Sequence, residues 1–262
     1  MRAPDSVALE YERFRDSDLG SVAAASEATD PRSARLEFGS HRPHLVAGGR
    51  TRRIEPVAYR PGMVGRLRRR DLDSDPLVQL EHWLAAARAA EVPEPEAMTL
   101  ATVGADGRPS ARMVLLRGLG PDGVDLFTNR ESRKAQELDG AGHAALVLYW
   151  EQMGRQIRVE GPVSRLDAVA SDAYFQSRPR GSRIAAWASP QSRPIADRAV
   201  LDRMVTEAEA RFPNEVPRPP FWGGYRVTPD LIEFWQAGEF RLHDRFRYRR
   251  APDGWIIDRL GP

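Results

Sequence analysis

The feature that most constrains this fold is a change of hydrophobic period between residues 93 and 98. Before it, Asp75 and Pro76 open a segment in which apolar residues recur at helical spacing, which predicts an amphipathic helix of about four turns that ends by Pro93. After it, residues 98–103 and 111–117 alternate between apolar and polar around a Gly/Asp turn. That alternation predicts two paired strands and makes the middle of the chain a sheet.

The rest of the chain continues this pattern of short strands with helices between them. Further strands are predicted at 124–128, 143–150 and 156–166, helices at 132–138, 167–177 and 195–212, and four short strands between a Pro-rich turn at 217–224 and Leu260. Strands and helices do not alternate regularly, which argues against a doubly wound parallel sheet. The sequence therefore predicts a mainly β protein, an antiparallel barrel with peripheral helices.

Composition excludes several classes of protein. The 262-residue chain is long enough for a large core, and its formal net charge is only +2. It contains no cysteine, which excludes disulfides, thiolate catalysis and zinc–thiolate sites, and it has no His pair at metal-binding spacing. It has no run of about 18 apolar residues, and its first residues lack the apolar stretch of a secretory signal. We expect a cytoplasmic protein without a metal or a membrane partner.

The N-terminal part differs in composition from the rest. Residues 1–54 contain few large apolar side chains and no sustained period, so we expect a disordered extension. Residues 55–75 are basic and are interpreted as a linker or as a lid over an anionic site, and residues 76–262 as the folded domain. Nucleic-acid binding by the arginines between residues 42 and 70 is the weakest interpretation, because acidic residues nearly balance the basic ones.

Four segments place arginine and hydroxyl side chains at the ends of predicted elements, at 112–117, 127–134, 174–182 and 235–245. Guanidinium groups grip phosphate oxygens in pairs while hydroxyls and amides take the remaining positions, so this composition is typical of phosphate-ester binding. In the second segment a helix start carries Arg133 beside Lys134, the only lysine in the chain. Surface cations on a short helix are the alternative interpretation there.

The last two segments add further cationic groups. In 174–182 a helix is expected to stop at Pro179 and to present Arg178 and Ser182 on a turn, with an exposed helix end as the alternative. In 235–245, Arg241, His243 and Arg245 alternate along a predicted strand and point to one face. These groups repel one another unless an anion lies between them, which favours an anionic ligand over a solvated strand face.

Together these segments resemble the pyridoxine/pyridoxamine 5'-phosphate oxidase family. The resemblance covers residues 66–262 and includes, in order, LRRRDL, RxVLLR, FTNxxSRK, GRQIRVEG, YFxSRPRGS, SPQSRP, FWGGYRV, IEFWQ, RLHDR and IDRLGP. It implies an FMN-binding split β-barrel that works as a homodimer with FMN at the subunit interface. It also implies oxidation of pyridoxamine or pyridoxine 5'-phosphate to pyridoxal 5'-phosphate, with O2 as electron acceptor and H2O2 as product.

The same resemblance assigns site residues by their place in these motifs. FMN is then bound by Arg112, Met113, Val114, Leu115, Leu116, Arg117, Phe127, Thr128, Arg133, Lys134, Gln156, Gln191, Ser192, Trp235 and Arg245. The substrate is bound by Arg117, Tyr174, Arg178, Ser182, Arg241 and His243, of which Arg241 and His243 are the catalytic residues that orient the pyridine ring. Two phosphates need two basic sites, and the segments around Lys134 and Arg178 supply two.

Two positions depart from the family pattern. Arg117 stands where the family usually has lysine. In the predicted lid, the family has an arginine three residues before a tyrosine, whereas Pro56 takes that position before Tyr59 here. Arg53 or Arg60 would then substitute for the missing arginine. Two alternative functions stay open. One is a related flavin oxidase with another substrate, as in phenazine biosynthesis, against which the intact substrate motifs argue. The other is a flavin- or pyridoxal-phosphate-binding protein with little turnover.

Overall fold

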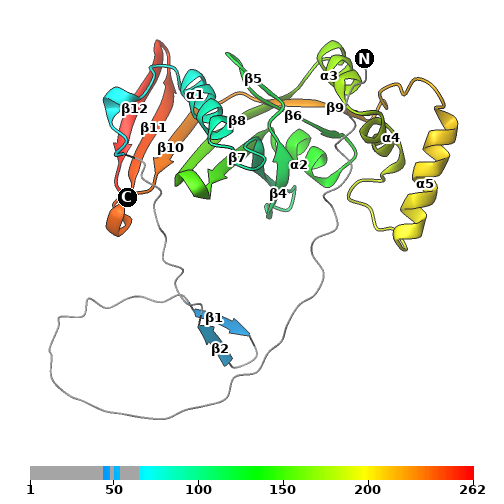
Figure 1. Cartoon of the computed structure of the whole chain (residues 1–262), viewed down its shortest axis with the longest axis horizontal. Helices are drawn as coiled ribbons and strands as arrows, with labels where there is room; N and C mark the ends of the chain where they lie inside the picture. The colour runs from blue at the N-terminus through cyan, green and yellow to red at the C-terminus, as the bar shows by residue number, and fades with distance from the viewer. Residues whose placement is uncertain (1–43, 48–49, 54–64) are drawn as a thin grey trace, which may run out of the picture. The chain divides into compact units, whose positions relative to one another are not determined.

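The computed structural model describes residues 44–47, 50–53 and 65–262 (Figure 1). Contacts divide the chain into two units, Met1–Val57 and Ala58–Pro262. In the first unit, β1 (His44–Ala47) and β2 (Arg50–Arg53) pair as an antiparallel hairpin. No element is predicted there from the sequence. Two glycines separate the strands in the sequence, but the segments on either side of this turn signal are too short to show a sustained period. The rest of the predicted extension, and residues 55–64 of the predicted lid, lie outside the described residues.

One antiparallel sheet, curled into a half barrel, forms the second unit. Its main path is β12–β11–β10–β8–β7–β3–β4, and β5, β6 and β9 continue it from the end of β8. The bounds are β3 (Ala97–Val103), β4 (Pro109–Leu115), β5 (Gly118–Gly120), β6 (Gly123–Asn129), β7 (His143–Trp150), β8 (Arg155–Arg165), β9 (Trp222–Val227), β10 (Leu231–Gln236), β11 (Asp244–Ala251) and β12 (Gly254–Leu260). This architecture confirms the predicted mainly β, antiparallel fold class.

Strand β8 joins the two halves of the sheet. It pairs with β7 and β10 along most of its length and with β9 through residues 163–165. Gly161 lies at this transition, where a Cβ atom would collide with the backbone of Thr228 and Pro229. Only glycine allows the two backbones to approach this closely.

The main core lies between the inner face of the sheet and helix α1 (Pro76–Ala89). Alternation along the strands buries Leu100, Leu146 and Phe234 completely on this face, and the indole of Trp83 in α1 meets the ring of Phe234 edge-on at 5.1 Å. Asp75 caps α1, because its carboxylate accepts a hydrogen bond of 2.8 Å from the Leu77 N–H. The predicted helix is confirmed.

A second, smaller core lies beneath the C-terminal helices and includes Phe175, Ile184, Ala208 and Trp222. The helices α2 (Arg133–Ala141), α3 (Ala168–Ser177) and α5 (Arg198–Arg211) match their predicted positions. Helix α4 (Arg180–Ala188) does not, because the sequence analysis expected a turn after Pro179. Pro179 is the N-cap residue of α4, so the proline that ends one helix begins the next.

The connection between β10 and β11 also corrects a prediction. Arg241 lies in a single 3-10 turn, Glu239–Arg241, and β11 begins only at Asp244, so Arg241 and His243 do not alternate along a strand with Arg245. Phe240 and Arg241 have positive φ angles of 54° and 63°. Gly238 permits the tight return of the chain, since a Cβ there would meet the backbone of Leu242.

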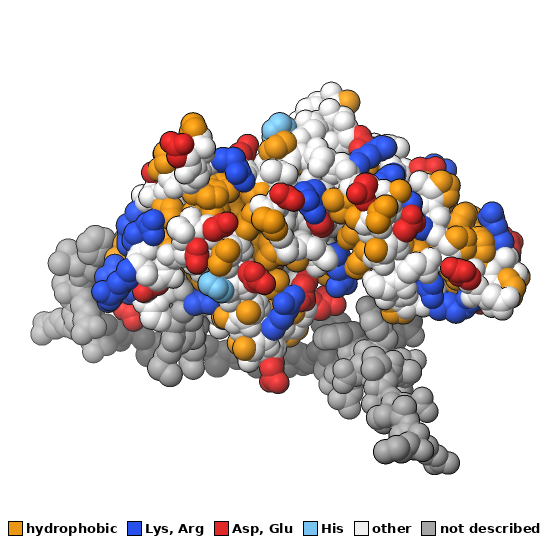
Figure 2. Space-filling view, turned by 90° about the horizontal axis from the view of Figure 1, so that it is seen from above, with side chains coloured by type: hydrophobic (Ala, Val, Ile, Leu, Met, Phe, Trp, Pro, Cys, Tyr) orange, Lys and Arg blue, Asp and Glu red, His pale blue; other side chains and the backbone are white. Residues whose placement is uncertain are grey.

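The surface mixes charges of both signs. Figure 2 shows basic and acidic side chains interspersed with hydrophobic ones over the face that it presents. Among the described residues, no helix is long and apolar enough to cross a membrane. Within the same residues, no group of three or more His, Asp or Glu side chains is placed to hold a metal ion.

Candidate functional site

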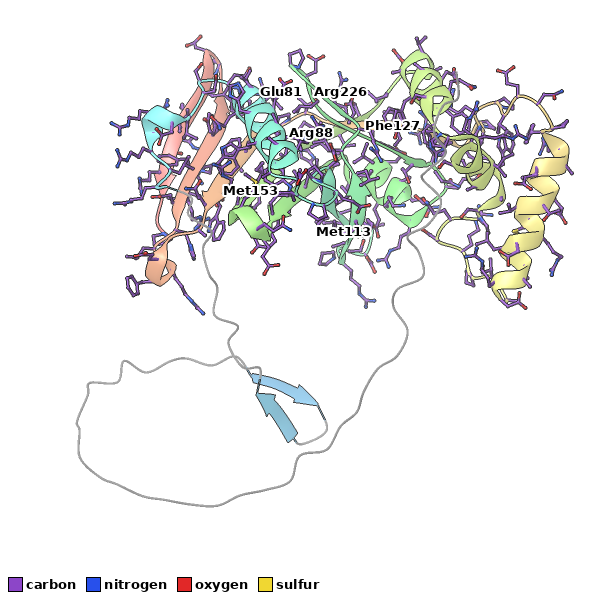
Figure 3. All side chains as sticks on the ribbon, in the orientation of Figure 1. Glu81, Arg88, Met113, Phe127, Met153 and Arg226 are labelled. Carbon is purple, nitrogen blue, oxygen red and sulfur yellow. The ribbon has the colours of Figure 1, made fainter. Side chains whose placement is uncertain are left out.

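A cavity of about 550 Å³ lies where β4 and β6 meet α2, α3 and α4. Small-molecule sites commonly measure about 300–1,000 Å³. Figure 3 shows Phe127 at the end of the sheet beside α3 and α4. The lining contains most of the residues predicted on these elements: Met113, Val114, Leu115, Arg117, Phe127, Thr128, Lys134, Tyr174, Arg178, Ser182 and Gln191. The structure thus brings predicted FMN residues and predicted substrate residues into one cavity.

Lys134 forms one polar corner of this cavity. Its Nζ lies 2.8 Å from Oε1 of Gln191, 3.2 Å from Oγ1 of Thr128 and 3.4 Å from Oγ of Ser132. None of these partners carries a charge, so no hydrogen-bond partner among the described residues neutralises the ammonium. Burial, and then the nearby Arg112 guanidinium, lower the pKa of Lys134. An anion in this corner would relieve both effects.

Arg112 and Arg133, two further predicted FMN residues, lie beside this corner and outside the cavity lining. Both donate to Glu137 of α2, Arg112 through Nη2 at 3.0 Å and Arg133 through Nε at 2.7 Å. The hydroxyls of Thr102 and Ser110 donate to the same carboxylate at 2.5 and 2.6 Å. Burial alone would raise the pKa of Glu137, but these hydrogen bonds lower it to about 2.

Aromatic rings and Arg178 form another wall. The rings of Phe127 and Tyr174 stack at 4.1 Å, and Trp222 stacks on Phe127 at 5.6 Å. The Arg178 guanidinium lies 4.8 Å from the Trp222 ring centre, and its Nη1 is buried with no hydrogen-bond partner in the described part of the chain. Burial lowers the pKa of Arg178, Tyr174 raises it, and the neighbouring Arg117 lowers it. A buried donor without an acceptor is costly, and an anionic ligand would satisfy it.

Another group of predicted residues lies on the outer face of the sheet. Tyr149, Gln156, Trp235 and Arg245 are direct cross-strand neighbours on β7, β8, β10 and β11. The next residues along these strands, such as Phe234, point into the core. The row is therefore one continuous strip of the outer face. We call Gln156, Trp235, Arg241, His243 and Arg245 the outer-face group; none of them lines the cavity of its own chain.

His243 belongs to this group through its contacts. Its ring centre lies 4.5 Å from that of Trp235, and its Nδ1 accepts a hydrogen bond of 3.2 Å from the Gly238 N–H. Burial, followed by the charges of Arg241 and Arg245, lowers the pKa of His243. Because Nδ1 accepts the Gly238 N–H, the neutral ring carries its proton on Nε2 and presents that N–H as a donor.

For four further residues the predicted site and the structure differ. Leu116 is buried in the core, and Ser192 is exposed with a φ of 69°, next to Gln191 in the loop that follows α4. Glu137 and Trp222 were not predicted as site residues. The spacing of four residues between Arg133 and Glu137 on one helix is the sequence signal for Glu137. Trp222 offers no such signal, because an aromatic residue in a strand is usually core.

The fold and the cavity together define a split-barrel protein with two basic corners and an aromatic wall, which suits a planar ligand that carries phosphate. The family model described as pyridoxamine 5'-phosphate oxidase matches residues 84–212, and that of the pyridoxine 5'-phosphate oxidase C-terminal dimerisation region matches residues 222–262. The chain belongs to the pyridoxine/pyridoxamine 5'-phosphate oxidase family and is an FMN-dependent oxidoreductase.

Named relatives agree with this membership. The pyridoxine/pyridoxamine 5'-phosphate oxidase of Burkholderia multivorans is 53% identical over 195 residues, which cover 73% of this chain and 91% of the relative. That of Roseobacter denitrificans is 54% identical over 190 residues, covering 72% and 94%. Among solved structures, PhzG from Burkholderia lata, in complex with tetrahydrophenazine-1-carboxylic acid, has 37% identity and a TM-score of 0.72, covering 77% of this chain and all of that one. An FMN-binding protein from Nostoc punctiforme, at 20% identity, a TM-score of 0.58 and coverage of 70% and 95%, shares the fold.

The residues of the cavity fit FMN. Lys134 has only neutral partners, and hydroxyl and amide groups surround it, which is the chemistry that a phosphomonoester requires. Met113 and Leu115 are exposed, at 63% and 37%, on the face of β4 that lines the cavity. These apolar side chains suit a flat ring system. The unpartnered Arg178 Nη1 offers a second place for an anion.

Proposed function

We propose that this protein oxidises pyridoxamine 5'-phosphate and pyridoxine 5'-phosphate to pyridoxal 5'-phosphate, with O2 as electron acceptor and H2O2 as product. One observation carries the proposal: cations line a single cavity at two separate places, Lys134 at one and Arg178 with the neighbouring Arg117 at the other, and neither Lys134 nor Arg178 has a carboxylate partner among the described residues. A phosphate-bearing cofactor and a phosphate-bearing substrate require this pairing. Curated relatives at 51–54% identity carry the name of this activity.

The residues near Arg178 supply the contacts for the substrate phosphate. Tyr174, Arg178 and Ser182 come from α3, its C-cap and the first turn of α4, which the shared Pro179 holds close together. A guanidinium and two hydroxyls give several donors for the three phosphate oxygens. Arg117, which lines the same cavity and whose charge lowers the pKa of Arg178, adds a further cation. Its fork replaces the ammonium usual in the family and keeps the charge.

Arg241 and His243 are the residues that we assign to the pyridine ring. Neutral His243 donates from Nε2, and Arg241 is exposed at the tip of the β10–β11 connection. Both orient the C4' carbon for oxidation. FMN bound in the cavity would supply the hydride acceptor for oxidation at C4', with O2 as the final electron acceptor, and for the amine substrate water would then release ammonia from the oxidised carbon.

We further propose that the active protein is a homodimer. The residues that line the cavity and the outer-face group lie on different parts of one chain. Four of the five outer-face residues fall within the matched dimerisation region. In a symmetric dimer each cavity receives the outer-face group of the other copy. Gln156, Trp235 and Arg245 then contact FMN, and Arg241 and His243 contact the substrate.

A second substrate class is favoured by the similarity to PhzG, whose structure contains a tricyclic carboxylic acid. The cation at Arg178 would also accept a carboxylate. We rank this substrate class second for two reasons. Identity to PhzG is 37%, against 51–54% for the curated relatives. The Tyr174–Arg178–Ser182 set also has more donors than a two-oxygen carboxylate uses.

The test is an aerobic assay of the FMN-loaded protein with pyridoxamine 5'-phosphate and with pyridoxine 5'-phosphate, in which pyridoxal 5'-phosphate and peroxide are followed together. We expect both products in equal amounts from at least one substrate. Bound FMN with turnover only on a tetrahydrophenazine carboxylic acid would establish the second class. Bound FMN without turnover on any of the three would indicate a binding protein and contradict the proposal.

A further inference from the structure

Glu137 connects the only buried ion-pair cluster that adjoins the Lys134 corner within the described part of the chain. Its side chain is 7% exposed, and both carboxylate oxygens are fully engaged. Oε2 accepts from Thr102 on β3 and from Ser110 and Arg112 on β4, whereas Oε1 accepts from Arg133 on α2. The carboxylate therefore fixes α2 to the edge of the sheet and holds two guanidinium groups at defined positions.

We propose that Glu137 is a positioning residue for the FMN phosphate: it aligns Arg112 and Arg133 beside Lys134, so that the three cations act as one preformed anion site. This inference rests on the proposed location of the phosphate at Lys134. Arg112 lies close enough to Lys134 for its charge to lower the pKa of the Lys134 ammonium. Arg133 and Lys134 are consecutive in the first turn of α2.

The charges in this cluster match the ligand. Arg112, Arg133 and Lys134 contribute three positive charges and Glu137 one negative charge, which leaves a local charge of about +2. A phosphomonoester carries about −1.5 to −2 near pH 7. Without Glu137 the corner would hold three cations with no fixed counter-charge, and Arg112, which is 21% exposed, would lose the one carboxylate partner that it has among the described residues.

Two physical effects of removing the Glu137 charge have opposite signs. Simple Coulomb attraction predicts tighter FMN binding, because a negative charge near the phosphate disappears. Positioning predicts weaker binding, because the two guanidinium groups lose the acceptor that holds them and must be ordered by FMN itself. The sign of the change in FMN affinity therefore separates the two effects.

The experiment measures the affinities of the apoprotein for FMN and for riboflavin by quenching of flavin fluorescence, for the wild type, Glu137→Gln and Glu137→Asp. We expect Glu137→Gln to weaken FMN binding about tenfold or more and riboflavin binding less than twofold. Glu137→Asp retains the charge but not the reach from α2 to β3 and β4, so it should also weaken FMN binding selectively. Glu131→Gln is the matched control, since Glu131 precedes the same helix and pairs only with the exposed Arg193.

Each outcome has a defined meaning. Unchanged or tighter FMN binding by Glu137→Gln would overturn the inference, as would an equal loss for FMN and riboflavin, which indicates general damage to the fold. A wild-type protein that binds riboflavin as tightly as FMN would instead refute the phosphate location itself. If Glu137→Gln does not fold, Ser110→Ala decides the question: it removes one neutral donor and should lower FMN affinity two- to fivefold without changing riboflavin affinity.

Discussion

The Nζ of Lys134 lies 2.8 Å from Oε1 of Gln191, although 57 residues separate them in the sequence. Gln191 follows α4, whereas Lys134 lies in the first turn of α2, so this contact joins the helical side of the cavity to the sheet side. Thr128 Oγ1 donates to the same Gln191 oxygen at 3.1 Å. The loop after α4 therefore closes the basic corner where we locate the FMN phosphate.

Replacing Lys134 by methionine should weaken FMN binding about 10- to 100-fold. The change removes charge-assisted hydrogen bonds to phosphate, each worth about 1.5–3 kcal/mol. Arg133→Ala should have a smaller effect in the same direction, because Arg133 is exposed and shares its charge with Glu137. Flavin fluorescence titration measures both, with riboflavin as the ligand that lacks phosphate. An FMN affinity unchanged in both variants would remove the phosphate from this corner.

Arg178→Ala should raise KM for the phosphorylated substrates about 10- to 100-fold and leave FMN binding intact. The buried Nη1 has no partner among the residues that the structure describes, so we expect its main acceptor to be the substrate phosphate. Steady-state kinetics with pyridoxamine 5'-phosphate gives KM, and pyridoxamine without phosphate is the control. The variant and the wild type should act on that control compound with similar kcat/KM. Equal losses on both compounds would show that Arg178 does not bind phosphate.

Arg241→Ala should abolish most turnover while FMN stays bound, and a mixture of Arg241→Ala and Arg178→Ala subunits should recover activity. In a symmetric dimer whose sites combine two copies, each mixed dimer has one intact site and one site with both changes. At a substrate concentration well below the raised KM of Arg178→Ala, random exchange of equal amounts then restores about one quarter of wild-type activity. Subunits are mixed after mild dissociation, and each variant treated alone is the control. No recovery would place Arg178 and Arg241 of the same chain in one site.

Protonation of His243 should weaken substrate binding and stability at acid pH. Its pKa lies below the ordinary value of 6.5, so the folded protein binds fewer protons than the unfolded chain between that pKa and pH 6.5. The stabilising contribution is complete above pH 6.5 and is lost as pH falls through the folded pKa. NMR titration of the ring, assigned with His243→Asn, should give a midpoint below 6.5. A midpoint above 6.5 would contradict the arrangement of Arg241 and Arg245 around the ring.

Gly161→Ala should lower the free energy of unfolding by about 1–3 kcal/mol. The new Cβ would collide with the backbone of Thr228 and Pro229 at the point where β8 passes from one half of the sheet to the other. Urea denaturation at constant FMN concentration measures the change. Gly181→Ala is the control, because a Cβ there meets nothing within 4 Å. Similar losses in both variants would indicate that close backbone approach is not the cause.

Local sequence patterns predicted most strands and most helices, although not β1, β2 and β5, because alternation, Gly/Asp turns and Asp caps act over a few residues. Helix α4 was not predicted, because a proline such as Pro179 usually ends a helix. Its role as the N-cap of a new helix depends on the packing of Ile184 and Ala188 in the second core. The turn at Arg241 was not predicted for a related reason. Its positive φ and the Gly238–His243 hydrogen bond are set by the chain reversal, which alternation does not encode.

The site was predicted as an FMN set and a substrate set, and the structure divides the same residues differently, into those that line the cavity and the outer-face group. Resemblance located Lys134, Tyr174 and Arg178, and the cavity unites them. It did not separate them from Trp235 and Arg245, because motif order carries no information about which part of a chain faces a second copy. Glu137 was missed since an acidic residue in a phosphate site contradicts simple charge matching. Its role becomes visible only when its hydrogen-bond partners are known.

Lys134 is the only lysine in a chain with 39 basic residues. The proposed product is an aldehyde, and aldehydes condense with unprotonated amines. Burial and Arg112 lower the pKa of Lys134, which makes it more reactive than an ordinary lysine. When the FMN phosphate occupies that corner, the side chain is shielded, and no other lysine amine exists for the product to modify. The holoenzyme would therefore release its reactive product without labelling its own side chains, and loss of the flavin would expose a single lysine side chain to modification.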